Sequence, residues 1–166
     1  RLSEQVLVAL CVASRDVART VRFNALLAIG EVARGHKVPM QLMRALGEAL
    51  GDGEADIRRA GAQGLALAKR RNKIPAEVLG ALGEALRDEM PQVRFNAAVA
   101  IARATGGAEM PSAAFDGLAE ALQGGETEVR RAAARAIATA GGASGHAIDA
   151  LGLALEDPAA EVRVSA

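Results

Sequence analysis

Aromatic side chains are nearly absent from this sequence of 166 residues. It contains no Trp, no Tyr and only three Phe, although hydrophobic residues make up 51% of the chain. The hydrophobic core must therefore be built from aliphatic side chains and Ala. Because small side chains let helices approach closely, this composition favours an all-helical fold over a sheet.

Cysteine and long apolar runs are scarce as well. The single Cys11 excludes an internal disulfide, which fits a reducing compartment. No apolar run reaches the roughly 18 residues that a membrane span requires, and no signal-peptide pattern opens the chain. We expect a soluble, cytoplasmic protein that does not enter a membrane.

Neither sign of charge is in excess over the whole chain. Twenty Lys and Arg balance twenty Asp and Glu, which argues against a general polyanion binder. The two parts of the chain differ, since residues 1–74 hold 13 basic and 7 acidic residues and residues 75–166 hold 7 and 13. Opposite charge at the two ends would permit head-to-tail association.

The sequence does contain an internal repeat. A pair of Val or Ile followed by Arg recurs at spacings of 36, 36, 36 and 33 residues, and Pro39, Pro75 and Pro111 keep the same 36-residue interval. An Asp stands five residues before the apolar member of each pair, except at Gly124. Such a regular period is typical of repeat proteins. The pairs are Val21-Arg22, Ile57-Arg58, Val93-Arg94, Val129-Arg130 and Val162-Arg163.

Each unit has the periodicity of two helices. Counting from Val93, apolar residues fall at i+4, i+7, i+8 and i+11, which is one stripe of an α-helix, and the other units repeat this stripe. A further helix precedes each stripe, and Gly-rich or basic loops should end the second helix of each unit. The preceding helices are predicted at 41–50, 77–86, 113–122 and 146–155, and the loops at 33–37, 69–73, 105–109 and 140–144.

Neither helix of a unit can bury its apolar stripe alone, so neighbouring helical hairpins must stack. The sequence therefore predicts an all-α fold, an α-alpha superhelix of about 4.5 helical hairpins in a single array. Val8 and Val12 stand where units two to four mostly carry polar residues or Gly. We expect further chain or another subunit to cover this face, which allows self-association through uncapped ends. The predicted units are 3–38, 39–74, 75–110, 111–143 and a partial fifth unit, 144–166.

The repeated pattern of Asp, four residues, Val or Ile, and Arg resembles the HEAT repeat over essentially the whole chain, in particular the short HEAT-like repeats of phycobilisome lyases. The resemblance implies a HEAT-like solenoid, a protein-binding scaffold, and a ladder of Asp–Arg bonds between adjacent repeats. An armadillo unit with a third helix fits less well, because the 36-residue period is shorter than the usual ~40–47. The resemblance leaves a phycobilin-lyase-like accessory protein as an alternative. The ladder residues are Asp16, Arg22, Asp52, Arg58, Asp88, Arg94, Arg130, Asp157 and Arg163, with Glu126 or Glu128 as substitutes for the Asp missing at Gly124.

A helical wheel places the third and seventh residues of each second helix opposite the core stripe. Odd units carry apolar residues there, and even units carry Arg or Gln. Since second helices line the concave side in the resembled family, we predict that a protein or peptide with acidic and apolar groups binds this row. The alternative is that Phe23 and Phe95 are buried against neighbouring helices and that the arginines only confer solubility. The row is Phe23, Leu27, Arg59, Gln63, Phe95, Val99, Arg131 and Arg135.

No enzymatic or metal-binding pattern stands out. His36 and His146 are the only histidines and lie about three repeats apart, and one Cys with two His cannot form a Cys/His metal site. The segment GDGEAD at 51–56 lacks the Gly and the final Glu of a calcium-binding loop. We predict no catalytic residues, no metal and no cofactor.

The remaining alternative is binding of nucleic acid or another polyanion. The segment KRRNK at 69–73, with Arg34 and Lys37, forms a basic cluster on the loops of units one and two that could neutralise phosphates. However, bases would find few aromatic partners for stacking. Lys69, Arg70 and Arg71 also follow a predicted helix, and cations at a helix C-terminus stabilise that helix without any ligand.

Overall fold

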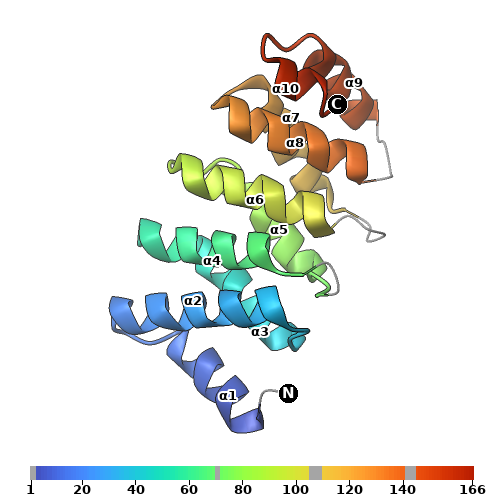
Figure 1. Ribbon diagram of the computed structural model, residues 1–166. Coiled ribbons are helices and arrows are strands. Elements are labelled where there is room, and N and C mark those ends of the chain that lie inside the picture. Colours follow the sequence, from blue (N-terminus) through green and yellow to red (C-terminus); the bar gives the residue numbers. More distant parts are fainter. Residues whose placement is uncertain (1–2, 70–71, 105–109, 141–144) are drawn as a thin grey trace.

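The computed structural model describes residues 3–69, 72–104, 110–140 and 145–166, the side chains of the last range from Ile148 on. In these ranges the chain forms ten α-helices and one 3-10 helix, and no strand occurs. Figure 1 shows helical hairpins stacked one on another in chain order, with the two termini at opposite ends of the stack. The predicted all-α superhelix is confirmed.

Each hairpin contributes one helix to each of two rows. The first helices are α1 (Glu4–Ala13), α3 (Met40–Glu48), α5 (Ala76–Ala85), α7 (Ser112–Gln123) and α9 (Gly145–Leu155). The second helices, which lie in front in Figure 1, are α2 (Arg19–Gly35), α4 (Ala55–Leu67), α6 (Pro91–Ala104), α8 (Thr127–Thr139) and α10 (Ala160–Arg163). The 3-10 helix η1 (Ala49–Gly51) follows α3.

The loop predicted at 33–37 is wrong in its first part, because α2 continues to Gly35. Ala33 is fully buried, and the His36 N–H donates to the carbonyl of Val32 at 2.8 Å. Packing of Ala33 therefore extends the last turn of α2 past the residue at which the basic and Gly residues had indicated a loop. The predicted loops at 105–109 and 141–144 lie outside the described residues.

Three prolines set the start of the first helices. Pro39, Pro75 and Pro111 immediately precede α3, α5 and α7, with φ of −60°, −62° and −58°. Each proline carbonyl accepts the first backbone hydrogen bond of its helix. Because the first N–H groups of a helix have no partner within it, a residue without an N–H costs nothing there.

The core is aliphatic and runs through the whole stack. Leu46, Leu82 and Leu118 of the first helices are completely buried, and they face completely buried residues of the second helices such as Leu65 and Ile101. Within each row, helices pack directly on their neighbours, α2 on α4, α4 on α6 and α6 on α8. Each hairpin therefore buries its apolar stripe against the hairpins beside it.

Glycines bring some of these helices into backbone contact. A Cβ atom on Gly83 of α5 would lie 2.6 Å from the Ala113 carbonyl oxygen, and one on Gly117 of α7 would lie 2.5 Å from the Gly83 carbonyl oxygen. In the other row, a Cβ atom on Gly30 would lie 2.9 Å from the Cα of Gly64. No side chain fits at these points, so the spacing between neighbouring hairpins depends on them.

A buried polar residue ties the loop after α4 to the end of α2. The Asn72 amide Nδ2 donates to the carbonyls of Ala33 at 2.8 Å and His36 at 2.9 Å, and the Val38 N–H donates to Asn72 Oδ1 at 2.9 Å. Asn72 is 5% exposed. Its side chain thus satisfies the carbonyls that the end of α2 leaves without helical partners.

Two substitutions in α5 test the backbone contact. We expect Gly83→Ala to lower the free energy of unfolding by about 1–3 kcal/mol, because the new methyl group overlaps the backbone of α7. Gly80→Ala meets no atom within 4 Å and should raise it by about 0.5–1 kcal/mol through helix propensity. Urea unfolding followed by circular dichroism measures both, and equal effects of the two substitutions would contradict the contact.

Candidate functional site

In every unit except the fourth, the Asp of the motif lies three residues before the second helix of its own unit. Its Oδ1 accepts a hydrogen bond from the backbone N–H two residues later, at 2.8 Å from Ala18 and Met90 and at 2.9 Å from Glu54. Asp157 makes the same contact with the Ala159 N–H at 2.8 Å. This arrangement is an Asx turn, which orients the chain for the helix that follows.

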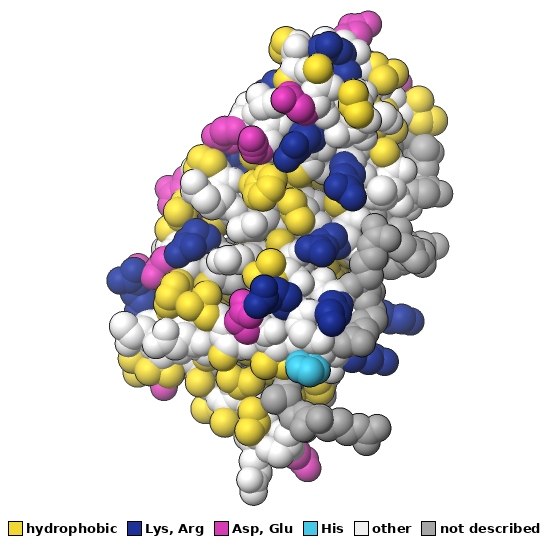
Figure 2. Space-filling model, in the orientation of Figure 1, with side chains coloured by type: hydrophobic (Ala, Val, Ile, Leu, Met, Phe, Trp, Pro, Cys, Tyr) yellow, Lys and Arg dark blue, Asp and Glu magenta, His cyan; other side chains and the backbone are white. Residues whose placement is uncertain are grey.

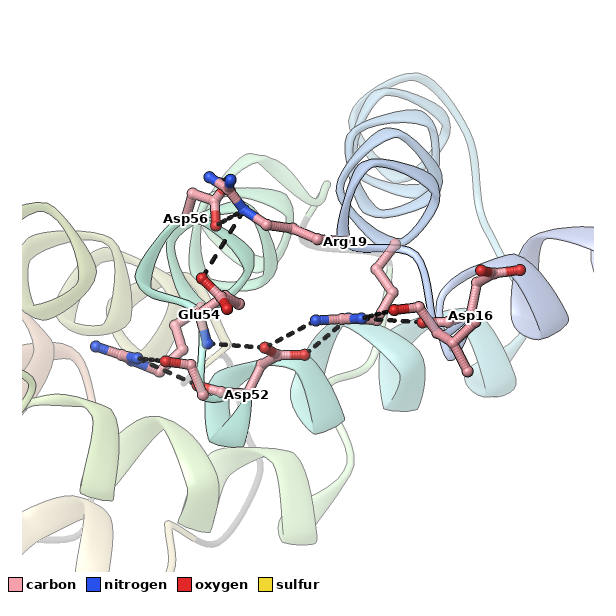
Figure 3. A network of polar contacts seen from close by, with 9 residues as sticks. Asp16, Arg19, Asp52, Glu54 and Asp56 are labelled. Carbon is pink, nitrogen blue, oxygen red and sulfur yellow. Dashed lines mark hydrogen bonds and ion pairs between the residues drawn. The ribbon is translucent and has the colours of Figure 1, made fainter.

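The Arg six residues after that Asp joins adjacent units. Its Nη1 donates to carbonyls of its own unit, as Arg22 does to Asp16 at 3.0 Å. Its Nε pairs with the Asp of the next unit, and Figure 3 shows this step at Asp52. The pairs between units are Arg22–Asp52 at 3.0 Å, Arg58–Asp88 at 2.6 Å and Arg130–Asp157 at 2.7 Å.

Unit four, which has Gly124 in place of Asp, completes the ladder differently. Arg94 Nη2 donates to both carboxylate oxygens of Glu126, at 2.7 and 2.8 Å. Glu126 rather than Glu128 therefore stands in for the Asp. Arg163 donates to the Asp157 and Pro158 carbonyls of its own unit.

A second series of ion pairs was not predicted. It joins Arg15 to Glu48, Arg44 to Glu77 and Arg87 to Glu120, each pair being separated by 33 residues in the sequence. A search for opposite charges at this spacing would have found it. All these side chains are well exposed to solvent, so the pairs add little to stability.

Three carboxylates of the ladder, Asp88, Glu126 and Asp157, have a lowered pKa. Burial of Asp88 opposes ionisation, but hydrogen bonds from Arg58 and the Met90 N–H and the nearby positive charges outweigh it, so the pKa of Asp88 lies below its ordinary value. The hydrogen bond from Arg130 lowers the pKa of Asp157, and the hydrogen bond from Arg94 lowers the pKa of Glu126.

Acid should therefore destabilise the stack. The unfolded chain takes up protons near the ordinary pKa values of 3.8 for Asp and 4.5 for Glu, whereas the folded chain does so only at lower pH. Stability from these groups is thus complete above about pH 5 and is lost as the pH falls through 4.5 and 3.8 toward the folded pKa values. Asp88→Asn should cost about 1–3 kcal/mol at neutral pH and flatten the loss between pH 5 and pH 3.

The control for this prediction is Asp116→Asn, which changes an exposed carboxylate of α7 outside the ladder. Urea unfolding at several pH values gives the free energy for each variant. The same pH dependence in wild type and Asp88→Asn would refute the role of the ladder.

The predicted row lies on the surface formed by α2, α4, α6 and α8, which we call the second-helix face. Figure 2 shows hydrophobic side chains interspersed with Lys and Arg on this side of the molecule. Phe23 and Phe95 pack partly against the core and are half-buried. Arg59, Gln63 and Val99 are also half-buried, whereas Leu27, Arg131 and Arg135 are exposed.

Two hollows on the second-helix face gather six of these eight residues. The larger, of about 690 Å³, lies between α6 and α8, and the smaller, of about 150 Å³, lies between α2 and α4. Phe23 and Arg59 belong to the lining of neither hollow. The larger is lined by Phe95, Val99, Ala102, Arg103, Arg131, Ala132, Arg135 and Ser165, and the smaller by Leu26, Leu27, Gly30, Glu31, Ala60, Gln63, Gly64 and Leu67.

Three arginines of the row differ from the other arginines of the protein. Within the described residues, the guanidinium groups of Arg59, Arg131 and Arg135 form no hydrogen bond or ion pair. Every other described arginine, for example Arg103 with the Ala66 carbonyl at 2.7 Å, has at least one such partner. Unpaired guanidinium groups are therefore concentrated on the second-helix face.

The basic cluster of units one and two is partly used within the fold. Lys69 Nζ donates to the Gly35 carbonyl at 2.9 Å, and Arg34 pairs with Glu31 at 2.6 Å. Lys37 is exposed, while Arg70 and Arg71 lie outside the described residues. The cluster thus serves in part to hold the end of α2.

Other surfaces offer little chemistry. Val8 and Val12 are 57% and 66% exposed and line a shallow apolar hollow on the outer side of α1. Among the described side chains, no three His, Cys, Asp or Glu residues come together as metal ligands would. None of the helices in the described ranges combines the length and the apolar character needed to cross a membrane.

Comparison with known proteins identifies the fold. No family model matches the chain, and no curated protein matches it. A designed armadillo repeat protein in complex with the peptide (KR)4 is similar with a TM-score of 0.74 and 22% identity, over 98% of this chain and 82% of that one. Computationally designed armadillo repeat proteins for modular peptide recognition give 0.71 and 21%, over 94% and 77%.

A third similar structure is E. coli YibA, with a TM-score of 0.67 and 20% identity, over 98% of this chain and 57% of that one. At these identities the likeness concerns the fold. The chain is a helical-repeat solenoid, built like the designed armadillo repeat proteins.

Proposed function

We propose that this protein is a non-enzymatic scaffold that binds a peptide segment of a partner protein along the second-helix face. The observation that carries the proposal is the set of unpaired arginine side chains on the second-helix face, Arg59, Arg131 and Arg135, of which Arg131 and Arg135 share a hollow with apolar residues of α6. An arginine without a protein partner retains its hydrogen-bonding capacity for a ligand. Arg and Phe are also enriched at protein contact sites.

The stack gives these residues a fixed spacing. They come from successive second helices, whose separation is set by backbone contact and by the Arg–Asp ladder. A partner would therefore be recognised as a linear pattern of charged and apolar groups. Two structural neighbours support this use of the fold, one solved with the peptide (KR)4 and one designed for modular peptide recognition.

The alternatives find less support. A phycobilin-lyase-like role depends on the resemblance in sequence pattern alone. Nucleic-acid binding through the basic loops is disfavoured because Lys69 and Arg34 already have partners within the protein. The second-helix face also offers only the half-buried Phe23 and Phe95 for stacking.

Selection from a random peptide library followed by variant analysis tests the proposal. Combining Phe23→Ser, Arg59→Ala, Phe95→Ser and Arg131→Ala should weaken binding of the selected peptides at least tenfold, since both the apolar and the charged contacts are removed. Because both Phe residues touch the core, Arg59→Ala with Arg131→Ala serves as a second variant that leaves the packing intact.

The matched control is Arg44→Ala with Arg87→Ala, which removes one arginine of α3 and one of the turn after α5, neither of them on a second helix. This control should bind like the wild type, and circular dichroism should show the same helical signal for all variants. Full binding by the second-helix variants would refute the proposal.

A further inference from the structure

We propose that the hollow between α6 and α8 binds the side-chain carboxylate of an acidic residue in the partner peptide, while an adjacent apolar residue of the peptide packs on Phe95 and Val99. This inference rests on the proposed function, and it assigns both the chemistry of the partner and the place where the peptide is anchored.

The two walls of the hollow differ in character. Phe95 and Val99 lie one turn apart on α6, and both are half-buried, so they form an apolar wall. Arg131 and Arg135 lie one turn apart on α8, and both are exposed, so they form a basic wall. A ligand that fills this space must carry an apolar group on one side and an anion on the other.

The charge of the hollow is unbalanced. Its lining contains three arginines and no Asp or Glu. Arg103 is held in place by its bond to the Ala66 carbonyl, whereas Arg131 and Arg135 have no partner among the described residues. Like charges at i and i+4 of a helix repel each other. A bound carboxylate would relieve this repulsion and accept hydrogen bonds from both guanidinium groups.

The hollow between α2 and α4 does not share these properties. Its volume is about 150 Å³ against about 690 Å³, and its lining contains Glu31 and no arginine. The carboxylate site is therefore confined to the α6–α8 end of the second-helix face, and it gives a bound peptide a preferred position along the stack.

The occupant is an acidic peptide rather than a basic peptide or a nucleic acid. The designed neighbour carries the basic peptide (KR)4, which the arginines of this hollow would repel. The apolar wall suits an aliphatic side chain, and the single half-buried Phe95 offers one aromatic ring for stacking.

Fluorescence anisotropy with defined peptides tests the inference. The probe is a fluorescein-labelled peptide with blocked ends that repeats Glu-Glu-Leu-Leu, and the comparison peptides replace every Glu by Gln or by Lys. We expect the Glu peptide to bind at least tenfold more tightly than either comparison peptide and to weaken as salt is raised. The double variant Arg131→Gln, Arg135→Gln should lose at least tenfold in affinity for the Glu peptide only.

The control variant Arg44→Gln, Arg87→Gln makes the same change of charge on α3 and on the turn after α5, and it should bind like the wild type. Equal binding of the Glu and Gln peptides, or full binding by the Arg131, Arg135 double variant, would overturn the inference. Tighter binding of oligo-dT than of the Glu peptide would also overturn it, in favour of a nucleic-acid site. If library peptides without Asp or Glu bind and lose affinity in the Arg59, Arg131 variant, while the Glu and Gln peptides bind equally, the inference fails while the proposed function stands.

Discussion

Burial of apolar surface between consecutive hairpins is the interaction on which the rest of this structure depends. A single hairpin of this sequence has two apolar stripes and too few large side chains to form a core of its own. Leu46, Leu82 and Leu118 are completely buried within the one core cluster that runs through the stack. Ala and Gly at many of the other contacts let the helices lie close together, so the second-helix face is a rigid surface rather than a set of separate helices.

The Arg–Asp ladder fixes how consecutive hairpins are aligned with each other. Each Asp organises the start of its own second helix and accepts the Arg of the preceding unit, while each Arg also holds carbonyls of its own loop. Partly buried ion pairs of this kind gain little net free energy, because desolvation offsets the attraction. Their effect is to make a wrong alignment of two hairpins costly, since it would leave buried charges unpaired. The ladder pairs the arginines of the repeated motif, whereas the side chains of Arg59, Arg131 and Arg135 on the second-helix face have no partner among the described residues.

The fold was predictable from the sequence because the same residue types return at a nearly constant interval, and two helices per interval follow from the apolar period. Other features depend on three-dimensional packing and were missed. Asn72 looked like part of a basic loop, yet its amide is buried against the end of α2. The eight residues of the row recur at the same position of each unit in the sequence, but only Phe95, Val99, Arg131 and Arg135 line the larger hollow. The size of a hollow depends on the angle and spacing of the two helices that form it, which the sequence pattern does not give.

The central claim is that each hairpin is stabilised chiefly by the hairpins beside it, and amide hydrogen exchange resolved along the chain tests it most directly. The account predicts that amides of α4, α5 and α6, which have hairpins on both sides, exchange most slowly, and that those of α1 and α9 exchange at least tenfold faster by opening locally. Equal protection of all helices, lost in a single step on mild destabilisation, would indicate one indivisible core and would contradict the account.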